Sequence, residues 1–329
     1  MSETANIASL AVSMSEKIFL TFGWQIHNVK DENFPCQKID KHQTKGAGGK
    51  HPVDCVFSYP DPCTDQTRFF LSDLKSYTKS SIGATDFAPY IRGVSKAVDC
   101  ASTSQVWNTR YVSPTILHWR VEGMLFVYNY DNTYDADFSA KAKGIDTTTI
   151  PLPRGSRLHL FTPENISYLQ SVVSDIKSYC AENHIKYADR RFYYSAQVLN
   201  QPSGNLLPVA SVEMLRGKLM IVALKDLEND GHHFLAYLRS EGSVEDFEYL
   251  ITFMFRSALL NFARCVYVKG VSFGANASDN FDAAGKQFLA RHYNLLEIGQ
   301  SLKKIKFGRV DRVTSSFSSL DEAKIRAKA

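Results

Sequence analysis

The chain has 329 residues, enough for two domains, and its 44% hydrophobic and 22% charged residues are typical of a globular protein. No apolar stretch approaches the ~20 residues that a membrane helix needs. No secretory signal is visible at the N-terminus. The formal net charge of +4 gives only weak support for a polyanionic partner. These features predict a soluble, cytoplasmic protein that has no contact with a membrane.

The six cysteines contain no C-x-x-C pair; they are Cys36, Cys55, Cys63, Cys100, Cys180 and Cys265. The spacing that is typical of zinc sites is therefore absent. We interpret the cysteines as packing residues of a reduced, cytosolic chain.

The first predicted element is a helix that follows a frayed lead-in over residues 1–9 and stops at Gly23. A strand is predicted to begin at Trp24. In the predicted helix, apolar residues recur at helical spacing along one stripe, which comprises Leu10, Met14, Ile18, Leu20 and Phe22.

A basic, glycine-rich loop follows from Lys41 to Lys50. It is not a Walker A loop, which needs a glycine five places before Gly49 and a Ser or Thr after Lys50. A basic loop just ahead of Asp54 would lie at the mouth of a site there. Lys45 and Lys50 are therefore candidate phosphate contacts, and a plain surface loop is the alternative.

A β-hairpin is predicted where two apolar runs flank the turn-forming residues 60–66. If the turn centres near Thr64, Asp54 falls roughly opposite Leu74, within reach of Asp73 and Lys75. Residues two apart on a strand share a face, so Asp73 and Lys75 point the same way. Two carboxylates and an ammonium group then converge on an apolar strand pair, and clustered carboxylates suit Mg²⁺.

A leading acid, a hairpin and then Asp73-Leu74-Lys75 resemble the PD-(D/E)XK nuclease superfamily. The resemblance covers roughly residues 10–130. Its one departure is the proline, which stands one place further from the acid, as Pro52-Val53-Asp54. The resemblance implies a restriction-endonuclease-like α/β core, in which a helix, a mixed central sheet and flanking helices follow one another. In that family the first helix carries a glutamate, a place that Glu16 fits.

The resemblance also implies roles for these residues. Asp54 and Asp73, helped by the Leu74 carbonyl, would bind Mg²⁺ or Mn²⁺, with Glu16 as an outer or second-metal ligand. Lys75 would orient or help deprotonate the attacking water. The alternative is a solvated strand edge, on which Asp73 and Lys75 form only a surface ion pair.

A helix is predicted from about Phe87 to Val98, after the Asp-x-Lys strand. In the family this helix presents polar side chains to the scissile phosphate, which makes Arg92 and Lys96 candidates by position. A clear strand over 121–130 would complete the core sheet.

The second half is predicted to be an α+β domain with its own core. We expect a nuclease domain over residues 1–185 and a C-terminal domain over 186–329, with no internal sequence repeat. From Ser301 onward eight Lys/Arg residues stand against three acids. Basic and apolar residues interleave there, so Lys303, Lys304 and Lys306 are candidate phosphate contacts, and a solvated strand or tail is the alternative.

The sequence thus predicts a metal-dependent endonuclease whose substrate is DNA rather than RNA and which needs no organic cofactor. A homodimer or a protein partner is expected, because cutting both strands normally needs two active sites. A nuclease fused to a second domain of this kind resembles effectors of prokaryotic defence systems, by analogy alone. The alternatives are a degenerate nuclease fold that binds or assembles with partners, and an RNA-directed nuclease.

Overall fold

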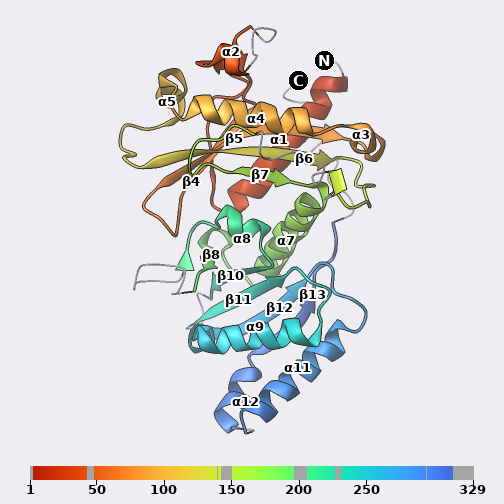
Figure 1. The fold of residues 1–329 in the computed structure, drawn as a ribbon. Coiled ribbons are helices and arrows are strands. Elements are labelled where there is room, and N and C mark those ends of the chain that lie inside the picture. The colour runs from red at the N-terminus through yellow and green to blue at the C-terminus, as the bar shows by residue number, and fades with distance from the viewer. Residues whose placement is uncertain are drawn as a thin grey trace. The chain divides into compact units, whose positions relative to one another are not determined.

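The computed structural model describes residues 3–42, 48–138, 140–141, 150–195, 206–226, 231–293 and 295–313 (Figure 1). The chain divides between Ser167 and Tyr168 into two compact units. The division falls inside helix α7 (Pro163–Glu182), ahead of the 185/186 boundary that was expected from the sequence. None of the described helices is both long and apolar enough to cross a bilayer.

The first unit contains a five-stranded mixed sheet in the order β1-β4-β5-β6-β7. The pairs β1/β4 and β4/β5 are antiparallel, and β5/β6 and β6/β7 are parallel. The central sheet is therefore mixed, as expected. Its strands are β1 (Gln25–Ile26), β4 (Cys55–Pro60), β5 (Thr67–Tyr77), β6 (Trp119–Asn129) and β7 (Leu158–Phe161).

Two helices cover the two faces of this sheet. Helix α1 (Glu3–Thr21) packs Phe19 against Phe57 and Phe161, with ring centroids 4.9 and 5.2 Å apart. The other face forms a core with α4 (Ala88–Ala101), because Phe69 and Leu71 alternate with Phe70 along β5. Figure 1 shows α4 lying along the sheet. Helix α1 starts at Glu3, so residues 3–9 of the expected lead-in are helical, and residues 1–2 lie outside the described part.

Shorter elements fill the connections of the first unit. An insertion of β2, α2 and β3 stands between β1 and β4, and two further helices flank α4. These elements are β2 (Phe34–Pro35), α2 (Ile39–His42), β3 (Lys50–His51), α3 (Lys79–Ala84) and α5 (Gln105–Tyr111).

The hairpin register differs by one residue from the sequence-based expectation. The ladder runs from Pro60↔Thr67 to Cys55↔Ser72, because the turn is centred between positions 63 and 64 rather than on Thr64. One further step along the ladder brings Asp54 opposite Asp73, not Leu74. Directly opposed residues share a face of the sheet, so the register places Asp54 on the face of Asp73.

The second unit contains a six-stranded sheet in the order β13-β12-β11-β10-β8-β9. Helices α9 and α11 share a hydrophobic core with one face of it. The elements are η3 (Tyr187–Asp189), β8 (Arg191–Tyr193), β9 (Leu206–Leu207), α8 (Val212–Arg216), β10 (Leu219–Lys225), β11 (His232–Leu238), α9 (Val244–Arg256), α10 (Leu259–Phe262), β12 (Ala263–Gly270), α11 (Ala277–Arg291), α12 (Leu296–Leu302) and β13 (Ile305–Arg309).

The second unit repeats the strand topology of the first. In the order β8-β10-β11-β12-β13, the first two pairs are antiparallel and the last two are parallel, as in β1-β4-β5-β6-β7. Each sheet follows a long helix, α1 or α7, and in each a helix (α4 or α9) links the third strand to the fourth. The chain thus carries a repeat of topology that is not evident as a sequence repeat.

The two hairpins also close alike, but they carry different chemistry. Pro60 pairs with Thr67 and Lys225 with His232, so six residues lie between the closing pairs in both cases. Counted from these pairs, the places of Asp54, Asp73 and Lys75 are held in the second unit by Leu219, Leu238 and Ser240. The second hairpin therefore has no carboxylate at these places.

Gly123 on β6 lies where α4 approaches the first sheet closely, so a larger residue there tests this packing. A Cβ at this residue would lie 2.3 Å from Leu158 Cδ2 and 2.6 Å from Val94 Cγ1. We expect Gly123→Ala to destabilise the protein by about 1–3 kcal/mol in urea denaturation, since neighbours on both sides must move. Gly93→Ala is the matched control, because nothing lies within 4 Å of its Cβ. Equal stability of the two variants would contradict this packing.

Candidate active site

Asp54 stands at the entrance to β4, and the edge of β5 holds its carboxylate. Its Oδ2 accepts a hydrogen bond from the Leu74 N–H at 2.7 Å, and its own N–H donates to the Ser72 carbonyl at 3.3 Å. The antiparallel ladder ends at Cys55. At Leu74, the next free N–H along β5, the side chain of Asp54 takes the place of a backbone partner. The structure therefore brings Asp54 to Asp73 and Leu74.

Lys75 is held between a carboxylate and an aromatic ring. Its ammonium group forms an ion pair with Asp73, and the two side chains are 24% and 21% exposed. The same Nζ lies 5.0 Å from the ring centroid of Tyr90 in the first turn of α4. The Tyr77 hydroxyl donates to the Tyr90 hydroxyl at 3.3 Å. Lys75 thus has a defined position, yet it keeps access to solvent.

The pKa of Asp54 is raised, because its carboxylate is buried and the positive charge beside it does not compensate. Burial raises the pKa of Asp54, the Leu74 N–H lowers it, the charge of Asp73 raises it and Lys75 lowers it. The raising effects outweigh the others, so the ionised form of Asp54 is destabilised. A bound cation would relieve this cost.

The donor atoms at this place fit a hard divalent cation. Asp54 and Asp73 supply carboxylate oxygens, which Mg²⁺ and Mn²⁺ prefer. In a β-strand the N–H and C=O of one residue point to the same side. Since the Leu74 N–H points to Asp54, its carbonyl points to the same edge, beyond the end of β4. The residues therefore fit the predicted ligand set of Asp54, Asp73 and Leu74.

Asp31 is a further acid that was missed from the sequence. Its N–H donates to the Asp54 carbonyl at 3.0 Å, and its φ of 52° lies in the left-handed region, which Asp adopts more readily than most residues. Burial raises the pKa of Asp31, and the charge of Asp54 raises it further. Only the tertiary fold brings this loop to β4, and no local pattern marks it.

Glu16 lies near this site but is engaged elsewhere. It sits on α1 and forms an ion pair with Lys30. In the part of the chain that the structure describes, neither Glu16 nor Asp31 forms one cluster of ligand atoms within 4.8 Å with Asp54 and Asp73. Burial chiefly raises the pKa of Cys55, and the charges of Asp54 and Glu16 add to this effect. Glu16 is therefore within electrostatic reach of this end of β4.

The predicted phosphate contacts of the first unit have different surroundings. Lys45 lies outside the described residues. Lys50 on β3 and Arg92 on α4 are exposed. Lys96 is half-buried and donates to the His42 carbonyl at 2.9 Å, so it supports the inserted segment.

The basic segment near residue 303 belongs to the second unit. Lys303 is exposed after α12, while Lys304 donates to the Leu260 carbonyl at 3.0 Å. Lys306 on β13 is exposed and lies over the Tyr267 ring, 5.3 Å from its centroid. Part of this segment forms strand β13, which does not test phosphate contact. Contact with phosphate therefore stays a prediction.

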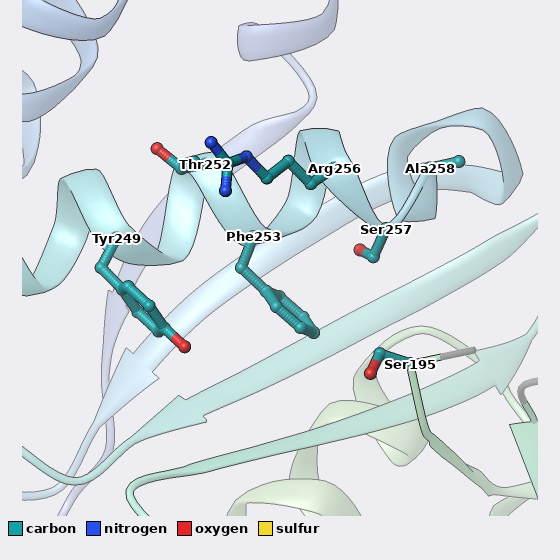
Figure 2. Close-up of a pocket in the computed structure, with 7 residues that line it drawn as sticks. All are labelled: Ser195, Tyr249, Thr252, Phe253, Arg256, Ser257 and Ala258. Carbon is teal, nitrogen blue, oxygen red and sulfur yellow. The ribbon is translucent and has the colours of Figure 1, made fainter. Parts of the chain in front are cut away.

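A pocket of about 350 Å³ lies along α9 in the second unit (Figure 2). Figure 2 shows Tyr249 and Phe253 pointing from the helix toward the side of Ser195, while the Arg256 side chain runs along the other side of the helix. Among its described lining residues, Arg256 is the only charged one. The pocket offers no carboxylate, so it is not a second metal site of the type at Asp54.

Comparison with known proteins agrees with this geometry. Residues 1–165 match the model of a family described as the GAPS4 protein PD-(D/E)XK nuclease domain. The match ends within a few residues of the division at Ser167 and covers half of the chain. No curated protein and no solved structure matches the chain.

The raised pKa of Asp54 predicts a stability cost at neutral pH. A folded-state pKa above the unfolded value means that the folded chain binds the proton more tightly, so stability is lost as the pH rises through the folded pKa. Asp54→Asn removes the charge and keeps an acceptor for Leu74. In chelator at pH 7.5, we expect it to melt at a higher temperature than the native protein.

The control is Asp65→Asn, because Asp65 is exposed in the turn of the same hairpin. The gap in melting temperature between native and Asp54→Asn protein should narrow as the pH falls and Asp54 protonates. A native protein that is the more stable of the two at pH 7.5 would contradict the electrostatic description.

Proposed function

The chain belongs to the family of GAPS4 proteins that carry a PD-(D/E)XK nuclease domain, and we propose that it is a metal-dependent endonuclease that hydrolyses DNA in the cytoplasm. The observation that carries this proposal is the half-buried Asp54 carboxylate, hydrogen-bonded to Leu74 beside the Asp73–Lys75 ion pair. Six free cysteines accord with a reducing compartment.

In the proposed mechanism the carboxylates of Asp54 and Asp73 and the Leu74 carbonyl would hold Mg²⁺ or Mn²⁺. Such an ion, when bound, would supply Lewis acidity and would lower the pKa of water. Lys75 orients the attacking water and balances the negative charge that develops on the phosphate. The ring of Tyr90 and the Asp73 carboxylate keep the Lys75 ammonium group at this place between reactions.

Asp31 is the better candidate than Glu16 for an outer ligand. Asp31 is hydrogen-bonded through its backbone to Asp54 and senses the charge of that carboxylate. Glu16 is neutralised by Lys30. We therefore assign Asp31 as the acid that would support an ion held by Asp54, and Glu16 as a more distant supporting acid on α1.

DNA is proposed as the substrate, with a homodimer or a partner chain for double-strand cuts. The second unit repeats the topology of the first but has Leu219 and Leu238 at the places of Asp54 and Asp73. The two described hairpins of one chain therefore supply one set of catalytic carboxylates between them, and a cut in each strand calls for a second chain. Lys50, Arg92 and Lys303 are exposed and are proposed as phosphate contacts.

The repeated topology also supports a second candidate function, in which the chain binds or assembles with partners. The second unit would fit this function, since its hairpin carries no carboxylate at the catalytic places. The first unit retains both acids and the lysine, which favours the nuclease. A role in defence against phage is proposed by analogy alone.

Plasmid cleavage tests the assignment of the catalytic residues. With Mg²⁺ or Mn²⁺, we expect Asp54→Asn and Asp73→Asn to lose at least about a hundredfold in rate. We expect Lys75→Met to lose about 10²–10⁴-fold, since it removes the group that handles the water. Asp65→Asn and Lys79→Met, at exposed positions, should cleave at the native rate. Cleavage by all three site variants at the native rate would sink the assignment.

The form of the plasmid product tests the number of active sites per chain. Because one chain supplies one site, we expect nicked circles to appear first at low protein concentration. Linear product should rise more steeply than linearly with protein concentration. Direct linearisation by a demonstrated monomer would overturn the single-site description. Matched DNA and RNA of one sequence, single- and double-stranded, decide the substrate: preferred RNA cleavage would replace DNA in the proposal.

A further inference from the structure

Four buried side chains with soft ligand atoms converge beside α4. They are Cys36 after β2, His42 at the end of α2, His51 on β3 and Cys100 on α4. Each offers one ligand atom, and these atoms all lie within 4.8 Å of one another. The most exposed of the four residues is only 5% accessible.

The separations within the cluster are those of a tetrahedral metal site. Zinc–sulfur bonds of ~2.3 Å and zinc–nitrogen bonds of ~2.0–2.1 Å place two sulfur ligands about 3.8 Å apart and a sulfur and a nitrogen about 3.5 Å apart. Cys36 Sγ and Cys100 Sγ are 3.8 Å apart. His42 Nδ1 lies 3.5 Å from Cys36 Sγ and 3.4 Å from Cys100 Sγ.

We propose that Cys36, His42, His51 and Cys100 form a structural Zn²⁺ site in the nuclease unit. Two thiolates and two imidazoles are a common zinc ligand set, and four protein ligands leave no open position for catalysis. The carboxylate and carbonyl oxygens at Asp54 suit a hard ion instead. The two sites therefore take different metals, and the zinc site stands independently of the proposed cleavage reaction.

The atoms around the cluster prepare both histidines for a metal. His42 Nε2 lies 3.1 Å from Asp99 Oδ2, which leaves Nδ1 for the ion, and zinc-bound histidines usually have such a partner on the second nitrogen. Lys38 in turn donates to Asp99 at 2.8 Å. His51 is 2% exposed, and its Nε2 has no hydrogen-bond partner among the described residues. A buried polar atom of this kind is costly unless it finds a ligand.

A disulfide between Cys36 and Cys100 is the main competing possibility. Its sulfur atoms would lie ~2.05 Å apart, against the observed 3.8 Å. Both cysteines are free in the structure. A disulfide would also leave both imidazoles facing the cluster without a function.

The proposed ion would fix the segment that leads into the catalytic hairpin. The insertion of β2, α2 and β3 contributes Phe34 and Cys36 to the core between the sheet and α4. Its Cys36 and His42 also contact Cys100, Asp99 and Lys96 of α4. His51 stands three positions before Asp54. A zinc ion that ties His51 to α4 therefore holds the approach to Asp54, while Lys96 holds the carbonyl of His42.

Metal analysis of the purified full-length chain tests the site. Expressed in zinc-supplemented medium and purified under reducing conditions, the native protein should carry about one Zn²⁺ per chain. Cys36→Ser and Cys100→Ser should lose it. The matched control Cys180→Ser removes a buried free cysteine outside the cluster and should retain it. Asp99→Asn should keep the ligands but weaken zinc affinity by about 10–100-fold in a competition titration with a chelating dye.

If the cysteine variants fail to fold, metal binding by the native protein alone tests the proposed zinc site. Growth in Co²⁺ should give the visible absorption of a tetrahedral cobalt–thiolate site, and a thiol-blocking mercurial should release one equivalent of metal. Folded native protein that binds neither zinc nor cobalt would overturn the proposal. Mass spectrometry that shows a Cys36–Cys100 disulfide in the active protein would overturn it as well.

Discussion

One hydrogen bond, from the Leu74 N–H to the Asp54 carboxylate, sets the arrangement of the candidate active site. It occurs where the backbone ladder of β4 and β5 stops, while β5 stays paired with β6 along its other edge as far as Tyr77. The same step of the register places Asp54 on the face of Asp73 and Lys75. A shift of one residue would turn Asp54 toward α1 and separate the two carboxylates, because side chains alternate between the faces. Burial and the charge of Asp73 both raise the pKa of Asp54, so the arrangement is costly without a cation.

Local patterns in the sequence sufficed to predict the part of the site that lies on one hairpin. Alternating apolar runs around a turn indicated β4 and β5, and two-residue spacing put Asp73 and Lys75 on one face. The turn centre is the least certain feature of such a pattern, and the expected register was wrong by one residue. Asp31 could not be found this way, since its place beside Asp54 depends on a left-handed residue and a loop that folds back. The cluster of Cys36, His42, His51 and Cys100 escaped for the same reason, because its fourth member comes from α4, far along the chain.

The two units show how one topology can hold different chemistry. Both sheets have the same order and directions over five strands, and both hairpins leave six residues between their closing pairs. The sequence showed no repeat, because hydrophobic alternation suffices to specify such strands and many apolar residues satisfy it. In the second unit, Leu219 and Leu238 pack where the first unit has two acids, so its hairpin needs no cation. We infer that catalysis belongs to the first unit and that the second serves binding or assembly.

The central claim is that Asp54 and Asp73 share a divalent cation, and an experimental structure determined with Mn²⁺ tests it most directly. Manganese can be located by its anomalous scattering without assumptions about the ligands. The account predicts a peak at ~2.1–2.2 Å from an oxygen of Asp54, an oxygen of Asp73 and the Leu74 carbonyl, with the Lys75 ammonium group nearby. A crystal of active protein, saturated with Mn²⁺, that shows its peak elsewhere and leaves Asp54 and Asp73 without an ion would contradict the account.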